Sequence, residues 1–151
     1  MFLVRPEADI PIVTVSINDN LGAKAHFDLG KALAPLRDEH TLIIASGQAT
    51  HSGRNPSIPA GLENWANEFQ EWLDNTLSTS STWSYDERCR QILDWESLPT
   101  AKIAHPTPDH FTPFLVAIGA GASEDAPTSE KLFGGWRDAL SFAAYAWGIV
   151  N

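Results

Sequence analysis

The sequence predicts an α/β fold, a partly parallel sheet flanked by helices, because a strand–helix–strand pattern runs through its first third. Residues 10–17, IPIVTVSI, are dense in β-branched side chains and end at the turn formers 18–20. Residues 23–39 have apolar side chains at helical spacing, which Pro35 interrupts. The apolar run 41–45, TLIIA, is typical of a strand covered on both faces. Because a helix joins these strands, we expect them to be parallel.

Length and composition predict one soluble domain over residues 1–151. The chain has 151 residues, of which 43% are apolar, and no apolar run long enough to span a membrane. Its 19 acidic and 10 basic residues give a net charge of −9, which excludes nucleic acid and anionic membranes as expected partners. The single cysteine, Cys89, rules out an internal disulfide. With no secretory signal pattern at the N-terminus, we expect a cytoplasmic protein.

The middle of the chain predicts two amphipathic helices. Residues 62–77 place tryptophan, phenylalanine and leucine side chains on one face, so the tryptophans are expected in the core rather than on a binding platform. Ser84 and Glu87 have the spacing of a capping box, which begins a second, shorter helix. Cys89 shares the apolar face of that helix and is interpreted as a packing residue, not a nucleophile. Residues 139–149 alternate in a way that indicates a terminal strand.

His51 is the first candidate functional residue. The predicted strand 41–45 is followed by the turn residues Ser46 and Gly47, and His51 lies four residues beyond that turn. Loops beyond the carboxyl ends of strands usually hold the ligands of α/β proteins. The polar, proline-rich loop that follows, with Arg54 as its only charge, is of a kind that often serves function. On this stretch alone, the sequence favours the interpretation of His51 as an ordinary polar loop residue.

A second histidine lies in the motif HPTPDHF, residues 105–111. Thr107 is a good N-cap and Pro108 suits the first helical position, so the sequence predicts a helix from Thr107 with His110 in its first turn. The helix dipole there favours the neutral imidazole that metal binding needs. The alternative is a surface histidine in a cap. His26 and His40, in and after the first helix, are expected to be solvated.

Three histidines, His51, His105 and His110, fall at element boundaries that one edge of the sheet could bring together. Three imidazole nitrogens suit Zn(II) or Fe(II), but no spacing between them fixes a metal site by itself. The sequence around Ser46 lacks the glycine that a hydrolase nucleophile elbow uses, and no glycine-rich phosphate loop is present. From the residues alone, a histidine metal site is a hypothesis.

The order of these motifs carries a family resemblance. The runs PEADIPIVTVSI, LGKALAPLRDE, LIIASGQATH, AHPTPDHFTPFLVAIGA and LSFAAYAW follow one another from about Pro6 to Trp147. In this order they resemble the C-terminal half of the class III extradiol ring-opening dioxygenases, and more narrowly their 4,5-DOPA dioxygenase branch. The resemblance implies an incomplete version of that family's α/β fold. It also implies an enzyme that opens a catechol ring with O2, using Fe(II), with Zn(II) often found in the same site.

The resemblance also implies roles for individual residues. His51 matches the family's active-site acid/base beside the metal, and His110 matches a metal ligand. Four further residues are expected beside the metal or against the substrate: His105, Ser46, Gly47 and Arg54.

The chain departs from the family pattern in two ways. Ser52 stands where the family usually has asparagine. The family's N-terminal half, which supplies two further histidine ligands and an Asp-His-Gly segment, has no match in this chain. We therefore expect a truncated enzyme that is weakly active or inactive by itself, with an exposed sheet edge that offers a surface for self-association. The alternative is a non-catalytic α/β remnant that binds metal weakly or pairs with another chain.

Overall fold

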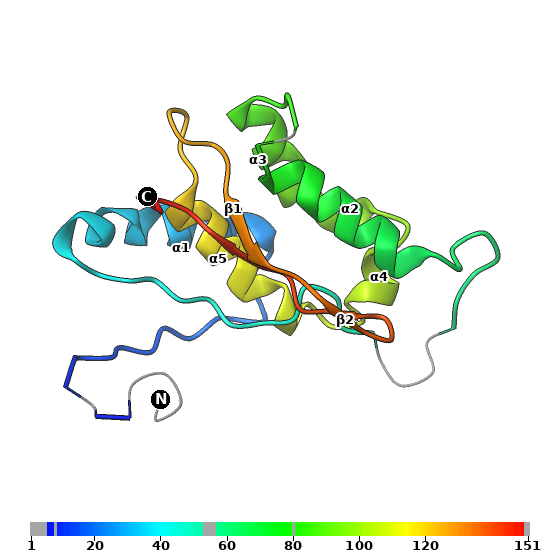
Figure 1. The fold of residues 1–151 in the computed structure, drawn as a ribbon, viewed down its shortest axis with the longest axis horizontal. Helices are drawn as coiled ribbons and strands as arrows, with labels where there is room; N and C mark the ends of the chain where they lie inside the picture. The colour runs from blue at the N-terminus through cyan, green and yellow to red at the C-terminus, as the bar shows by residue number, and fades with distance from the viewer. Residues whose placement is uncertain (1–5, 8, 53–56, 80, 150–151) are drawn as a thin grey trace.

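Helices dominate the architecture, with two short hairpin-like sheets packed beside them (Figure 1). The structure is a computed structural model that describes residues 6–7, 9–52, 57–79 and 81–149. Its helical elements are α1 (Ala23–Leu33), η1 (Ala34–Glu39), α2 (Trp65–Leu77), α3 (Tyr85–Leu93), η2 (Trp95–Ser97), α4 (Ala101–Ala104), η3 (Pro108–His110) and α5 (Thr112–Gly121). Its strands are β1 (Glu130–Phe133), β2 (Trp136–Arg137), β3 (Leu140–Ser141) and β4 (Ala144–Ala146).

Two glycines allow α1 and α5 to cross at backbone contact. A Cβ atom on Gly30 would lie 2.1 Å from the carbonyl oxygen of Val116, and one on Gly119 would lie 2.1 Å from the carbonyl oxygen of Phe27. Arg37, just beyond α1, reinforces the crossing because its Nη1 donates to the carbonyl of Ala120 at 2.9 Å, at the end of α5 where carbonyls lack helical partners. The two helices therefore form one tightly joined unit.

The core is built from residues of α2, α3, α4 and α5 together with Phe27 of α1, and α2 packs as predicted. Trp65, Phe69 and Leu73 are buried on its apolar face, which confirms the core interpretation of that helix. The predicted capping box is present at the start of α3, where Ser84 and Glu87 each bond the other's backbone N–H. Arg88 is buried and donates to carbonyls of the α2–α3 connection, those of Thr76, Ser78, Ser81 and Trp83.

Both sheets are two-stranded and antiparallel. In the first, β1 pairs with β4, with Lys131 opposite Tyr145 and a bulge between Lys131 and Phe133. In the second, β2 pairs with β3 through a tight turn at Asp138, whose φ is 55°. The single terminal strand predicted over residues 139–149 is therefore two short strands separated by residues 142–143.

The partly parallel sheet predicted from the sequence does not form within the described residues. Segments 10–17 and 41–45 are extended, but neither is part of a strand ladder there. Their apolar side chains are exposed, with Val13 at 84%, Leu42 at 81% and Ile44 at 64%. A β-strand gains its stability from cross-strand partners and covered faces. Neither segment has a cross-strand partner in the described structure, and only Ile17, Ile43 and Ala45 are partly buried.

Prolines account for the other departures from the predicted helices. Pro35 ends α1 and turns residues 34–39 into a 3₁₀ helix, the interruption that the sequence predicts. The helix predicted from Thr107 instead begins as the 3₁₀ turn η3 and restarts as α5 at Thr112. A continuous helix would place Pro113 in its interior, where the ring clashes with the preceding turn. None of the helices in the described parts of the chain combines the length and apolar character that a membrane span requires.

We expect Gly30→Ala to destabilise the protein strongly. Alanine favours a helix over glycine by about 1 kcal/mol, but its Cβ would lie 2.1 Å from a backbone oxygen that cannot move without separating the helices. Overpacking of this kind costs about 1–3 kcal/mol or more. Urea unfolding measures the change, with Gly22→Ala as the control because a Cβ there meets nothing within 4 Å. Equal stability of both variants would contradict the close crossing.

Candidate functional site

The loop that carries His51 is fastened to α4 by its backbone. The backbone N–H of His51 donates to the carbonyl of Ala104 at 2.7 Å. Two residues earlier, the carbonyl of Ala49 accepts a hydrogen bond from Nε2 of His105 at 3.1 Å. Ala104, the last residue of α4, and His105 after it thus hydrogen-bond to the two ends of the sequence Ala49–His51. These two bonds fix the position of this stretch against α4.

Thr50 fastens the same loop to the β2–β3 hairpin on its other side. Its side chain is fully buried, and its Oγ1 donates to the carbonyl of Ala139 at 2.8 Å while accepting the backbone N–H of Ser141 at 2.7 Å. Gln48 adds a third bond, from Nε2 to the carbonyl of Ser141 at 2.6 Å. The hydroxyl of Thr50 is therefore used fully as both donor and acceptor, which fixes the position of the residue before His51.

Gly47 brings the backbone of the loop against the backbone of η3. A Cβ atom on Gly47 would lie 2.0 Å from the carbonyl oxygen of His110, so only glycine allows this approach. The turn predicted at Ser46–Gly47 is not formed, because the chain is extended there and bends at Ala49–Thr50 instead. Gly47 nevertheless sets the distance between the two histidine-bearing segments. Ser46 itself is exposed.

His51 and His110 stack face to face as a result. Their ring centroids are 4.1 Å apart and their planes differ by 14°. A metal ion binds imidazole through a nitrogen lone pair in the plane of the ring. Two nearly parallel planes do not meet at one ion, so this arrangement favours different roles for the two rings rather than joint ligation.

Asp109 adds a carboxylate beside the stacked pair. Its Oδ2 lies 3.6 Å from Nε2 of His110, and its Oδ1 accepts a hydrogen bond from the hydroxyl of Thr107. That hydrogen bond is the main reason why the pKa of Asp109 lies below its usual value, with smaller contributions from the charges of His110 and His51. The sequence analysis did not name Asp109 as a site residue. The signal that could have found it is its position directly before His110 in the motif HPTPDHF.

His105 lies beneath the pair as a buried, neutral imidazole. It is 3% exposed and is surrounded by the rings of Phe69, Trp95 and Phe111. Because a carbonyl only accepts, Nε2 carries the proton, and the buried Nδ1 has no hydrogen-bond partner among the described residues. Burial lowers the pKa of His105 to about 4. Its position supports the loop before His51 rather than exposing a nitrogen to substrate.

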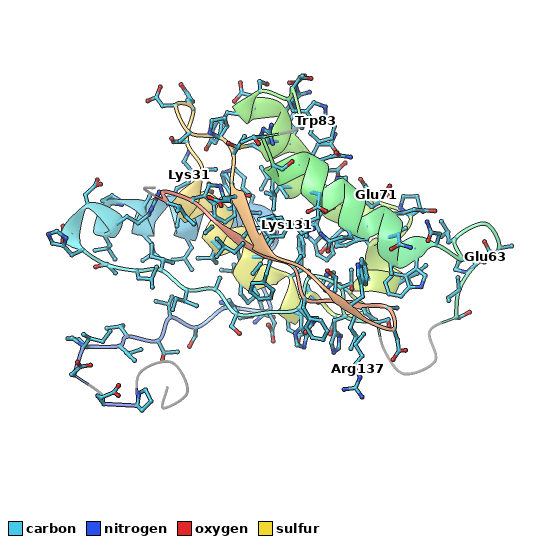
Figure 2. The ribbon with its side chains drawn as sticks, in the orientation of Figure 1. Lys31, Glu63, Glu71, Trp83, Lys131 and Arg137 are labelled. Atoms are coloured by element: carbon cyan, nitrogen blue, oxygen red, sulfur yellow. The ribbon has the colours of Figure 1, made fainter. Side chains whose placement is uncertain are left out.

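A buried polar network extends from Thr50 to the surface of α2. Ser141, which bonds Thr50, donates through Oγ to Oε1 of Gln70, and Gln70 donates to the hydroxyl of Tyr145 at 2.6 Å. That hydroxyl donates to Asp74 at 2.5 Å, and Lys131 donates to the other oxygen of Asp74 at 2.8 Å. Figure 2 shows Lys131 at β1, near the helix α2 that carries Asp74. Burial raises the pKa of Tyr145, which keeps its hydroxyl protonated as a donor.

The described residues do not make up a complete metal site. Protein sites for Fe(II) and Zn(II) generally use three or more side-chain ligands. Within the described ranges, no group of three histidine, cysteine or acidic side chains lies close enough together to hold an ion. The stacked planes of His51 and His110 let only one of the two imidazoles direct a nitrogen at a given ion, so the residues present do not fit a complete iron or zinc site on their own.

The remaining residues singled out in the sequence are Arg54, His26 and His40. Arg54 lies outside the described residues. The expectation that His26 is solvated is wrong, because it is 3% exposed and its two ring nitrogens face the carbonyl of Gly22 and the backbone N–H of Asn18. These bonds hold the turn that leads into α1, which is a structural use of the ring. His40 is exposed, as expected.

These features define a mixed α and β protein with a histidine-lined candidate site. The family model described as "Catalytic LigB subunit of aromatic ring-opening dioxygenase" matches residues 1–139. The chain therefore belongs to this family of aromatic ring-opening dioxygenases, which agrees with the resemblance found in the sequence.

Individual proteins are also similar to this chain in sequence and in structure. A protein of Beta vulgaris named "4,5-DOPA dioxygenase extradiol" is 40% identical over 148 residues, covering 96% of this chain and 52% of the relative. One of the same name from Portulaca grandiflora is 37% identical, covering 98% of this chain and 53% of the relative. The crystal structure of an uncharacterized Escherichia coli K12 protein superimposes with a TM-score of 0.78 at 28% identity, over 97% of this chain and 59% of that one. The chain thus spans about half the length of the curated relatives it matches.

We expect Thr50→Val to lower the free energy of unfolding by about 1–3 kcal/mol, the usual cost of leaving buried polar groups unpaired. Valine keeps the shape of threonine but leaves the Ala139 carbonyl and the Ser141 N–H without their partner. Thr50→Ser, which keeps the hydroxyl, is the control and should lose less. Urea unfolding of both variants makes the comparison, and a valine variant as stable as wild type would show that the hydroxyl does not fasten the loop.

The buried His105 predicts an acid-sensitive fold. Its pKa is about 4 in the folded protein and near 6.5 in the unfolded chain, so between these values only the unfolded state takes up the proton. The free energy of unfolding should therefore fall as pH drops from about 6.5 to about 4, by up to about 3 kcal/mol. Denaturant titrations across this range measure the slope. His105→Gln, which removes the titrating group, should flatten it, and an unchanged slope would assign the effect to other groups.

Proposed function

We propose that this chain provides the His51 and His110 portion of a metal-dependent extradiol dioxygenase that opens catecholic rings such as that of DOPA. The observation that carries this proposal is the stacked contact between the two histidines, since it joins the two motifs through which the sequence resembles the family. Family membership and the relatives named 4,5-DOPA dioxygenase extradiol support the class of reaction and substrate.

The proposed roles differ for the two rings. His110 would bind the metal, Fe(II) or Zn(II), with Asp109 beside it. His51 would exchange a proton with a substrate hydroxyl, a task that suits imidazole near neutral pH. Their parallel planes support this division, because only one of the rings can direct a nitrogen at a given ion. When bound, Fe(II) would supply the activation of O2, whose two oxygen atoms enter the opened ring.

The remaining predicted residues are proposed to position the two histidines or to contact the substrate. Gly47 sets the approach of the loop to His110, and His105 holds the carbonyl of Ala49. Ser46 and Arg54 are proposed to lie against substrate. A cytoplasmic location is part of the proposal because Cys89 is the only cysteine. The α/β sheet with parallel strands at 10–17 and 41–45 is likewise proposed to form only when those segments find strand partners.

A second candidate is a non-catalytic module. It is favoured by one observation, the lack of a three-residue metal cluster within the described ranges. On this reading the chain binds metal weakly or pairs with another polypeptide. The isolated chain, loaded with Fe(II) without oxygen and then mixed with DOPA and air, should give little or no yellow ring-opened product. Stoichiometric iron with turnover would exclude this second candidate.

The function itself is best tested in a chimera in which this chain replaces the 148 matched residues of the Beta vulgaris relative. We expect the chimera to bind iron and to consume O2 with DOPA. His110→Ala should remove most of the iron. His51→Gln should retain iron but lower turnover by about 10²–10⁴-fold, the usual contribution of a general acid or base.

His40→Gln is the matched control for the chimera, because this histidine is exposed and lies outside the site. Iron content and oxygen uptake are measured for each variant. A chimera that binds iron and turns over normally after His110→Ala would remove His110 from the site. Equal loss of iron and turnover in His51→Gln would contradict its role in proton transfer.

A further inference from the structure

Ser141 of β3 holds the loop that carries His51 through its backbone. Its N–H donates to Oγ1 of Thr50 at 2.7 Å, and its carbonyl accepts a hydrogen bond from Nε2 of Gln48 at 2.6 Å. One residue of the hairpin thus fixes two positions of the loop, directly before His51. How accurately His51 is placed beside His110 therefore depends on how firmly Ser141 is itself held.

The β2–β3 hairpin is too short to hold Ser141 firmly on its own. Its ladder consists of two residue pairs, Trp136 with Ser141 and Arg137 with Leu140, and both residues of β2 are exposed. An isolated two-stranded hairpin is at best marginally stable in water. The position of Ser141 must therefore be fixed by contacts with another element.

Gln70 of α2 supplies such a contact. Its side chain is 5% exposed, and its neighbours on the helix, Phe69 and Leu73, are fully buried in the core. Oε1 of Gln70 accepts the hydroxyl proton of Ser141, whose own exposure is 1%. A buried amide is costly unless it is hydrogen-bonded, so this bond favours one placement of the hairpin against α2. It links the hairpin to a helix that is anchored in the core.

The outer end of the same network fixes the orientation of the Gln70 amide. The Asp74 carboxylate, paired with Lys131 at 2.8 Å, only accepts, so the single proton of the Tyr145 hydroxyl goes to Asp74 at 2.5 Å. The Tyr145 oxygen then accepts from Nε2 of Gln70 at 2.6 Å, which leaves Oε1 for the Ser141 hydroxyl. A flipped amide would set its oxygen against the Tyr145 oxygen with no proton between them. Only one orientation of Gln70 therefore satisfies every group.

We propose that Gln70 is a positioning residue for His51. It acts through Ser141 and Thr50, which connect it to the loop by an unbroken series of hydrogen bonds. Tyr145 supports it by keeping the amide in the required orientation. The inference rests on the proposed role of His51 in proton transfer, because it assigns to Gln70 the placement of that ring. A misplacement of about 1 Å at a reacting group can cost about 100-fold in rate.

Gln70→Met tests the proposal in the whole chain, because methionine keeps the length of the side chain and removes both hydrogen bonds. At present the ring of His110 lies 4.1 Å from that of His51 and shields its protons. We expect the His51 ring protons of the folded variant to shift downfield in NMR spectra, toward the positions found for the exposed His40. Tyr145→Phe removes only the acceptor of the Gln70 amide and should shift them less, in the same direction. This milder variant keeps the test decisive if methionine at position 70 prevents folding.

Ile92→Val is the matched control for a role in stability alone. Ile92 is fully buried on α3 outside the network, and the loss of one methyl group lowers stability modestly. Because NMR signals of folded molecules report the native geometry, this variant should keep the His51 ring shifts of the wild type. Unchanged ring shifts in Gln70→Met and Tyr145→Phe, or an equal change in Ile92→Val, would overturn the proposal.

The chimera with the Beta vulgaris relative gives a second readout. There Gln70→Met should retain iron and leave KM for DOPA near its original value, while kcat falls by about 10- to 100-fold. Loss of iron and of kcat in equal measure would contradict a positioning role, since it would show that Gln70 supports the whole site. A wild-type chimera without turnover would refute the proposed function, whereas the ring shifts in the chain by itself would still decide whether Gln70 places His51.

Discussion

The hydroxyl of Thr50 holds the site loop against the β2–β3 hairpin, and the placement of His51 beside His110 depends on that contact. The residue after it, His51, has its backbone bonded to α4, so the loop is fixed from two sides. With the loop fixed, Gly47 can meet the backbone of His110 closely enough to bring the rings together. The geometry of the candidate site is therefore set by backbone anchors, and the His51 and His110 side chains that they bring together are partly buried.

The same device, a glycine that permits backbone contact, appears at the α1–α5 crossing and at the site. Gly30 and Gly119 join two helices, and Gly47 joins the loop to η3. His110 lies in η3, immediately before α5, so the helix that crosses α1 also positions the second histidine. Arg37 extends this link by bonding the last carbonyls of α5. A substitution that moves α5 relative to α1 would therefore also change the distance between the rings of His51 and His110.

Features encoded by neighbouring residues could be predicted from the sequence. The apolar stripe of α2, the capping box at Ser84 and the interruption at Pro35 all depend on side chains within one or two turns. For contacts between distant segments, the element-boundary positions of His51, His105 and His110 gave only a hypothesis of a shared site. The family resemblance singled out His51 and His110 from that group. The buried bonds of His26 and the role of Thr50 depend on partners that no local pattern reveals. The strands predicted at 10–17 and 41–45 do not form in the described structure for a related reason. A β-branched, apolar sequence favours an extended backbone, but it does not say which segment will pair with it.

The α1–α5 crossing has a further consequence for how the molecule comes apart. The glycine contacts and the core beneath α2 use none of the exposed side chains of residues 10–17, so this part of the structure is stabilised independently of that segment. Regions with few buried contacts open at a lower free energy than the core they border. The protein therefore contains a cooperative helical unit and a less protected extended segment, residues 10–17. A protease that cuts extended chain would cleave this segment first, while the helical unit stayed intact.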